Sequence, residues 1–280
     1  MEKYELVKDD YIIFNGHKLF RIRALKDFQT IHGLTVNTGD LGGYIQSEKN
    51  LSQDGKSWVA GNARVYGDAE VLGNACVSDN AKVYDDACVF DNAYVLDNAC
   101  VSDNARVYGN ACVYGDAYVY GDAKVFGNAW VHDDACVFEN ACMYDYACVF
   151  GDAYVYGNAC ICSYALVYGE ACVYSDACVC GDAKVCNNAD ICNDTDYMYI
   201  KGLGGISDTT FYKCKDNQIG VTCGFFKGTL DEFISHLKST HKDTKFDKEL
   251  LPFVEKELLP FFEVVKIHFG LDKNTSATAN

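Results

Sequence analysis

The stretch that decides the fold is Ala111-Cys112-Val113-Tyr114-Gly115-Asp116-Ala117-Tyr118-Val119-Tyr120-Gly121-Asp122, which is two units of a six-residue repeat. Alanine stands at every sixth position from residue 63 to residue 189, twenty-two times in all. Two residues after each alanine comes valine, except at Met143, Ile161 and Ile191. This alternation puts alanine and valine on one side of a short strand, and the Gly, Asp or Asn that follows tolerates the backbone of a sharp bend. One unit cannot bury its own apolar pair, so the units must coil and stack into a solenoid.

Period six, with an aliphatic residue two positions after a small one, resembles the hexapeptide-repeat family. The resemblance implies a left-handed parallel β-helix with three units in each triangular coil. Residues 57–194 then make about 7–8 coils, and stacking at about 4.8 Å gives a rod roughly 37 Å long. We therefore expect a mainly β chain with three parts: a small N-terminal β cap in residues 1–50, the β-helix in residues 51–200, and a C-terminal α+β domain for capping or oligomerisation in residues 201–280.

Both flanking segments carry local signals for their structure. Asn15-Gly16 between two apolar stretches predicts a hairpin with a type I′ turn. Residues 210–214 and 218–223 predict a second hairpin, and Thr229 with Glu232 forms a capping box that starts a helix. Residues 247–269, interrupted by Pro252 and Pro260, predict two short apolar helices.

The negative charge is concentrated on the rod. The chain has a net charge of −16, and residues 57–194 hold 20 acidic against five basic side chains. At intervals of eighteen residues, one corner of the coil carries the acidic column Asp116, Asp134, Asp152 and Glu170. Like charges about 5 Å apart in water repel by roughly 0.8 kcal/mol, so the column costs stability unless a cation or a basic partner lies against it. Two interpretations stay open: the acids serve only as good corner residues, or they form a binding surface.

Aromatic and cysteine residues occupy outward positions of the repeat. We expect two aromatic columns to form a partner surface, because such apolar area exceeds what monomers usually expose. Together with Leu258, Leu259, Phe261 and Phe262, they predict a homo-oligomer, either a dimer or a trimer. The cysteines are interpreted as reduced, semi-apolar strand residues, and no metal site, cofactor or catalytic residue is assigned. The two columns are Tyr66, Tyr84, Tyr120, Phe138, Tyr156 and Tyr174, and Phe90, Tyr108, Phe126 and Tyr144.

The flanking motifs carry a second resemblance. Gly39-Asp40-Leu41-Gly42-Gly43-Tyr44 before the repeats and Cys223-Gly224-Phe225-Phe226-Lys227-Gly228 after them are similar to uncharacterised proteins of phages and prophages. The resemblance implies an accessory protein in the host cytoplasm and implies no reaction. A charged N-terminus and interrupted apolar stretches disfavour membrane insertion, and the acidic rod disfavours direct nucleic-acid binding.

We therefore expect a non-catalytic protein that binds, and thereby inhibits, a host protein with a basic surface, of the defence or nucleic-acid-processing kind. The alternatives are a hexapeptide acyltransferase and a phage structural component. The uninterrupted repeats argue against the acyltransferase, because such enzymes usually shape their acceptor pocket with an extruded loop. The only histidine in the rod is His132.

Overall fold

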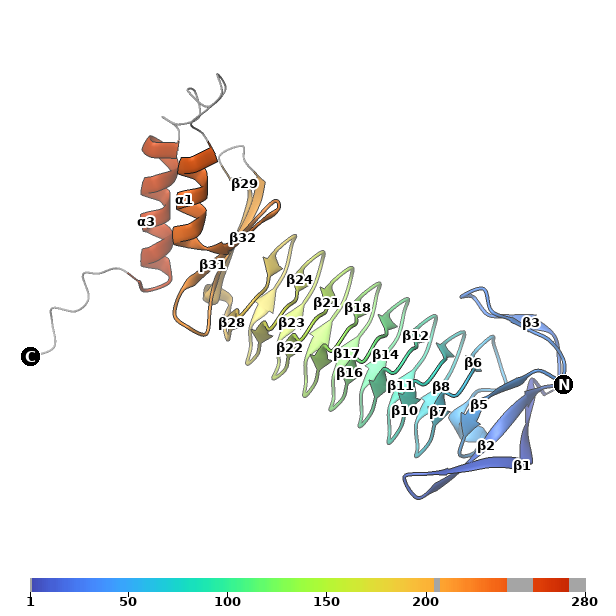
Figure 1. Cartoon of the computed structure of the whole chain (residues 1–280). Helices are drawn as coiled ribbons and strands as arrows, with labels where there is room; N and C mark the ends of the chain where they lie inside the picture. Colours follow the sequence, from blue (N-terminus) through green and yellow to red (C-terminus); the bar gives the residue numbers. More distant parts are fainter. Residues whose placement is uncertain (1, 204–206, 241–253, 272–280) are drawn as a thin grey trace, which may run out of the picture.

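The computed structural model describes residues 2–203, 207–240 and 254–271. The chain forms a straight β-solenoid with a strand cap at the N-terminal end and strands with helices at the C-terminal end (Figure 1). Twenty-three strands of two residues, β6 to β28, make about eight coils, three strands to a coil. The solenoid and its mainly β character are as predicted. The left-handed sense of the coil stays a prediction.

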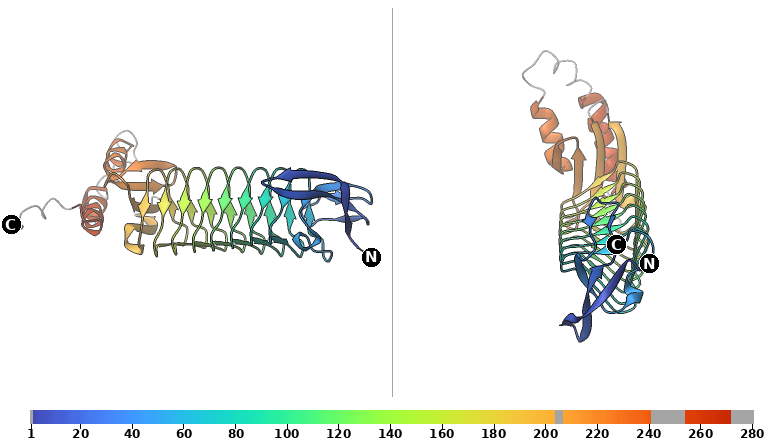
Figure 2. Two further views of the ribbon diagram at one scale, coloured as in Figure 1. Left: turned by 90° about the horizontal axis from the view of Figure 1, so that it is seen from below. Right: turned by 90° about the vertical axis from the view of Figure 1, so that its right-hand side faces the viewer.

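Every third strand pairs in parallel with the strand one coil away, so the solenoid has three flat faces (Figure 2). The first face consists of β7 (Arg64–Val65), β10 (Lys82–Val83), β13 (Cys100–Val101), β16 (Tyr118–Val119), β19 (Cys136–Val137), β22 (Tyr154–Val155), β25 (Cys172–Val173) and β28 (Asp190–Ile191). The second face consists of β8 (Glu70–Val71), β11 (Cys88–Val89), β14 (Arg106–Val107), β17 (Lys124–Val125), β20 (Cys142–Met143), β23 (Cys160–Ile161) and β26 (Cys178–Val179). The third face consists of β6 (Trp58–Val59), β9 (Cys76–Val77), β12 (Tyr94–Val95), β15 (Cys112–Val113), β18 (Trp130–Val131), β21 (Cys148–Val149), β24 (Leu166–Val167) and β27 (Lys184–Val185).

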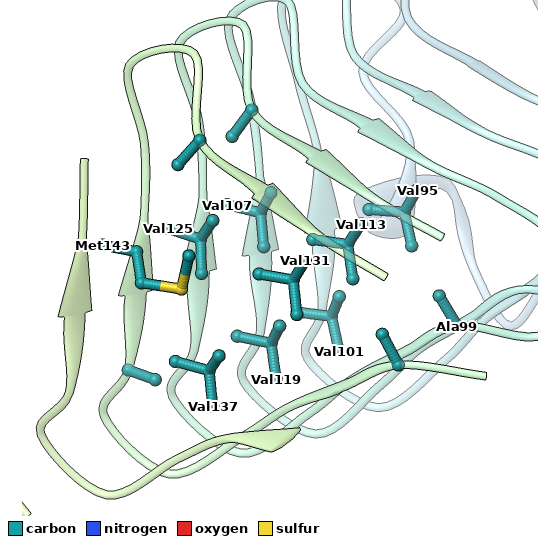
Figure 3. Packing of buried hydrophobic residues seen from close by; sticks show 14 of the residues in the cluster. Val95, Ala99, Val101, Val107, Val113, Val119, Val125, Val131, Val137 and Met143 are labelled. Atoms are coloured by element: carbon teal, nitrogen blue, oxygen red, sulfur yellow. The ribbon is translucent and has the colours of Figure 1, made fainter. Parts of the chain in front are cut away.

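The interior of the solenoid is built mainly from the alanine and valine positions of the repeat. All twenty-two alanines of the repeat, and the aliphatic residues two positions after them, are fully buried. Valines of successive coils lie behind one another in rows, and Met143 extends one of these rows (Figure 3). Because branched side chains stack at the strand spacing, each coil buries the apolar surface that its neighbour would otherwise expose.

The bends between strands use the left-handed backbone conformation that the sequence predicts. The residue four positions after each alanine from Ala63 to Ala183 has a positive φ, whether it is glycine, as at Gly121 with φ 69°, or a side-chain-bearing residue, as at Asp97 with φ 58°. Asparagines at the following position hydrogen-bond along one corner. Nδ2 of Asn74, Asn92 and Asn110 each donates to Oδ1 of the asparagine one coil on, at 3.0–3.1 Å, the last acceptor being Asn128.

The N-terminal cap extends the first face. β1 (Tyr4–Phe14) and β2 (His17–Ala24) form the predicted hairpin through Asn15 and Gly16, which have φ of 49° and 81°. β5 (Leu41–Ile45) pairs with β2 and, in parallel, with β7. The short strands β3 (Phe28–Gln29) and β4 (Thr35–Val36) and the 3₁₀ turn η1 (Glu48–Asn50) complete the cap.

A buried lysine lies under the first coil. The Lys3 ammonium donates to the carbonyl and hydroxyl oxygens of Ser57 at 2.8 and 3.0 Å. Burial lowers the pKa of Lys3 to about 8. Within the described residues, no coil lies below Ser57 to pair with its polar atoms. The Lys3 amino group therefore provides the hydrogen bonds that these buried atoms need.

The C-terminal end is closed by side chains as well as by a sheet. Asp194 Oδ1 accepts from the Cys178 amide at 2.7 Å, and the Tyr197 hydroxyl accepts from the Cys180 amide at 3.2 Å. The amides of the last second-face strand are therefore paired, which removes an exposed edge. The capping elements are the 3₁₀ turn η2 (Asp194–Asp196) and a four-stranded sheet of β29 (Tyr197–Leu203), β30 (Ser207–Lys213), β31 (Ile219–Cys223) and β32 (Phe226–Thr229).

The C-terminal helices pack on this sheet. α1 (Leu230–Thr240) starts with the predicted capping box, in which the Thr229 amide donates to Glu232 Oε2 at 2.8 Å. The π-helical turn η3 (Val254–Leu258) leads directly into α3 (Leu259–His268). Pro260 lies in the first turn of α3, where proline is tolerated, so it does not separate two helices as predicted. Pro252 lies outside the described residues.

Of the four apolar residues that we expected at an oligomer interface, Leu258 and Phe262 lie inside this cap, whereas Leu259 and Phe261 are half-buried against it. Leu258 is 3% exposed and Phe262 is fully buried. Phe262 contacts the rings of Phe211 and Phe233, with centroids 6.2 and 5.8 Å away. These two residues therefore form the core of the cap and do not support oligomerisation. Oligomerisation itself stays a prediction.

Candidate functional site: the acidic corner and the first face

The structure brings the predicted acidic column together on one edge of the first face. Each of the four residues lies in the bend just before a first-face strand, β16, β19, β22 or β25. These strands pair in parallel at one-coil intervals, so neighbouring carboxylates are one strand spacing apart along the rod, about 4.8 Å. All four side chains are exposed. They are Asp116, Asp134, Asp152 and Glu170, and we call them the acidic column.

Other acids of the rod have a structural task. A carboxylate at the positive-φ corner position accepts a hydrogen bond from the glycine amide one coil further along, as Asp97 does from Gly115 at 3.1 Å and Glu139 does from Gly157 at 2.9 Å. This hydrogen bond explains why an acidic residue occupies each of these corner positions. We call these residues the capping acids. They are Asp91, Asp97, Asp103, Asp133 and Glu139.

The acidic column lies one position later in the bend and has no such task. Within residues 2–203, 207–240 and 254–271, no hydrogen bond or ion pair engages its carboxylates. A cation contacts the main chain of the column at one end, namely Lys215 in the β30–β31 turn. Its ammonium donates to the main-chain oxygen of Glu170 at 2.9 Å. The column is therefore an open ladder of negative charge with a cation at its C-terminal end.

Exposed tyrosines lie beside the acidic column. Tyr118 and Tyr154 are 46% and 44% exposed and project from β16 and β22, two residues after Asp116 and Asp152. Cys136 lies between them in the same register. Burial raises the pKa of the Cys136 thiol, and the nearby charge of Asp134 raises it further. The sequence analysis missed Tyr118 and Tyr154, although their position directly after the acidic corner is readable from the repeat.

The predicted aromatic columns exist, but their rings cover one another. Phe138 is stacked between Tyr120 and Tyr156, with centroid distances of 4.8 and 5.0 Å. The members are half-buried, because mainly ring edges face the solvent. Tyr66 is only 4% exposed, since Phe14 and His17 of the N-terminal hairpin pack on it. The prediction that Tyr66 lies on an exposed outer surface is therefore wrong.

The second predicted column is stacked in the same way from Phe90 to Tyr144. In the first column, Ser102 takes the position between Tyr84 and Tyr120 and interrupts the stack. A third stack, which was not predicted, runs along the third face. It consists of Tyr114, His132, Phe150 and Tyr168.

The single rod histidine takes part in an arrangement that resembles a catalytic one. His132 Nε2 lies 3.5 Å from Cys148 Sγ, and Nδ1 lies 3.2 Å from a carboxylate oxygen of Asp133. Burial raises the pKa of the Cys148 thiol to about 11, with Asp133 adding to the effect. The thiol therefore keeps its proton at neutral pH, whereas a nucleophilic cysteine needs a lowered pKa. The imidazole is also held between the rings of Tyr114 and Phe150. This cluster favours packing over catalysis.

Comparison with known proteins agrees with the fold. The model of the YdcK beta-solenoid repeat matches residues 99–115 and 105–121, which lie in four consecutive units of the rod. The chain is a β-solenoid repeat protein. No curated protein matches it. In the described parts of the chain, no helix combines the length and the apolar character needed to cross a membrane.

Proposed function

We propose that this β-solenoid is a non-catalytic binding protein whose acidic column docks on a basic surface of another protein. The observation that carries the proposal is the division of the rod's acids. The capping acids hold the coil together, whereas Asp116, Asp134, Asp152 and Glu170 are exposed and unpaired among the described residues. A ladder of like charges lowers stability, and a basic partner would reverse that effect.

The surroundings of the column suit a protein partner. Tyrosine combines a large apolar ring with a hydroxyl and is enriched among the residues that dominate binding energy. Tyr118 and Tyr154 stand on a flat, rigid β surface, so their positions are fixed before binding and little entropy is lost. Arginine is the expected partner residue, because it pairs with carboxylates and stacks on aromatic rings.

The nature of the partner follows from charge and from the resemblance noted above. Net charge of −16 repels phosphates, which favours a protein that itself binds nucleic acid through a basic groove. Spaced carboxylates would take the place of phosphates in that groove. The resemblance to phage and prophage accessory proteins supports a host protein as the target and inhibition as the outcome.

Capture from host-cell lysate at two salt concentrations tests the proposal. The wild-type chain is compared with a variant in which the column is neutralised by Asp116→Asn, Asp134→Asn, Asp152→Asn and Glu170→Gln. We expect a captured protein that is lost in the variant and at high salt, because exposed charges are screened within about 10 Å at 0.1 M.

A control variant distinguishes the effect of the acidic column from the effect of the net charge of the chain. Asp91→Asn, Asp103→Asn, Glu139→Gln and Asp145→Asn remove the same number of charges from acids at the other two corners of the rod. This control should retain the captured protein. Equal capture by all three chains, or equal loss from both variants, would contradict a binding role for the acidic column.

A further inference from the structure

Two Cys-x-Cys segments lie on adjacent coils of the second face. They are Cys160-Ile161-Cys162 on β23 and Cys178-Val179-Cys180 on β26. Ile161 and Val179 are buried in the solenoid, so the cysteines on either side of each point away from its interior, although Cys162 is only 7% exposed. The strands pair in register, with Cys160 opposite Cys178. The repeat thus places four thiols in a block of two by two.

Three of these thiols converge. The sulfur atoms of Cys160, Cys162 and Cys178 all lie within 4.8 Å of one another. A tetrahedral ion bound at about 2.3 Å from each sulfur places the sulfurs roughly 3.8 Å apart. Side-chain rotation on a fixed backbone covers this difference. In the same column, Cys142 pairs with Cys160 but is not one of the three converging thiols, and Cys88 pairs with the charged residues Glu70 and Arg106.

The surroundings keep the Cys160 and Cys178 thiols protonated when the cluster is empty. Burial raises the pKa of the Cys160 thiol, and burial together with Cys160 raises the pKa of Cys178 to about 12. Three thiolates at this separation would repel one another strongly, so the neutral form is favoured until a cation arrives. An arriving ion displaces one proton from each thiol that binds it, and these protons pass to the solvent.

We propose that Cys160, Cys162 and Cys178, with Cys180 as the fourth ligand, bind a soft, thiophilic metal ion of the zinc class. Thiolate ligands select ions such as Zn²⁺ and Cu⁺ over hard cations. Cys180 is exposed, and its sulfur lies 3.6 Å from the Tyr197 hydroxyl. This thiol stands at the open edge of the cluster, where it can join an ion held by the other three. The site lies on a different face from the acidic column and is independent of the proposed function.

Metal titration of the reduced, metal-free full-length chain tests the site. Co²⁺ serves as the optical probe, because thiolate ligation gives it an intense absorption, and Zn²⁺ is then added in competition. We expect one equivalent of ion per chain. Cys160→Ser or Cys178→Ser should weaken binding by at least the roughly tenfold to hundredfold that even an outer-shell partner is worth. Cys88→Ser, in the same column of the same face, should bind like the wild type.

Thiol protection on the wild-type chain gives a readout that needs no variant. Bound Zn²⁺ should shield Cys160, Cys178 and Cys180 from alkylation and leave Cys88 as reactive as before, whereas Cys162 is buried without the ion. Circular dichroism of each variant shows whether it is folded, and protection decides the matter if one is not. Affinity unchanged by either serine substitution in a folded chain, protection of a different set of cysteines, or no bound equivalent would overturn the proposal. A parallel titration with Cu⁺ shows which ion of the class the site prefers.

Discussion

Asp133 and Asp134 are neighbours in the chain, yet among the described residues only the Asp133 carboxylate accepts a hydrogen bond and lies close to a histidine. This carboxylate accepts from the Gly151 amide at 3.2 Å and lies 3.2 Å from His132 Nδ1. Asp134, one position later in the same bend, is exposed beside Asp116 and Asp152 of the acidic column. One residue type therefore has opposite effects on stability at adjacent positions.

Neutralising Asp134 should stabilise the rod. Asp134→Asn removes like-charge repulsion, and the new amide can donate to a neighbouring carboxylate, as Asn104 does to Asp122 at 2.8 Å. We expect the melting temperature to rise by one or a few degrees, as measured by circular dichroism at low salt.

The matched substitution Asp133→Asn changes the net charge equally and should lower the melting temperature. An amide oxygen accepts from the Gly151 amide more weakly than a carboxylate does, and the contact with His132 loses its charge. A fall for both variants would mean that Asp134 supports the corner in a way that the contacts do not reveal.

The interior should not accept a larger side chain. Ala117 is fully buried in the narrow coil, and Tyr118 next to it points outward. Ala117→Leu forces neighbouring coils apart and should cost on the order of 1–3 kcal/mol. The control Tyr118→Leu places the same side chain one residue away on the outside. Urea unfolding of the two variants measures the difference, and equal stabilities would contradict the inward assignment of the alanines.

The solenoid could be predicted from the sequence because the six-residue pattern is local and repeats without interruption. Ala117 and Val119 are predictably inside, and Asp97 and Gly115 predictably bend the chain. Partners one coil away are harder to predict. Asp133 and Asp134 look alike in sequence, and only the stacked coil shows which of them meets a glycine amide. Likewise, Tyr66 is covered by a hairpin fifty residues earlier in the chain, which no periodicity reveals.

The same limit applies to the thiols. Equal spacing makes Cys88, Cys142, Cys160 and Cys178 one column, and that spacing alone does not single out its C-terminal end. The distinction arises because Cys162 and Cys180 replace aromatic residues in the adjacent column only there. Convergence of side chains from two columns is a property of the folded coil.

The aromatic residues should divide into those that stabilise the rod and those that bind. Phe138 is stacked on both sides, and each stacked pair is worth about 0.5–1.5 kcal/mol beyond burial. Phe138→Ala should therefore destabilise the chain by a few kcal/mol. Tyr154→Ala, at an exposed position of the same face, should leave the melting temperature within a degree or two and reduce capture of the partner.

Alkaline pH should unfold the protein through its buried thiols. Burial raises the pKa of Cys76 from 9.0 to about 12, with Asp79 adding to the effect, and burial raises the pKa of Cys112 to about 11. Because the unfolded chain loses these protons first, the stabilisation is complete below pH 9 and is lost as the pH rises towards 11–12. At pH about 10.5, the loss at Cys76 alone is on the order of 2 kcal/mol.

Thermal melts between about pH 8 and pH 10.5, in reductant and chelator, should therefore show a falling melting temperature. Cys76→Ala removes one of the titrating groups, so its melting temperature should fall less steeply over the same interval, whatever its value at neutral pH. Cys180→Ala is the control, because this cysteine is exposed on the outside of the rod. A Cys76→Ala profile as steep as that of the wild type would show that the Cys76 thiol is no better protected from ionisation in the solenoid than in water.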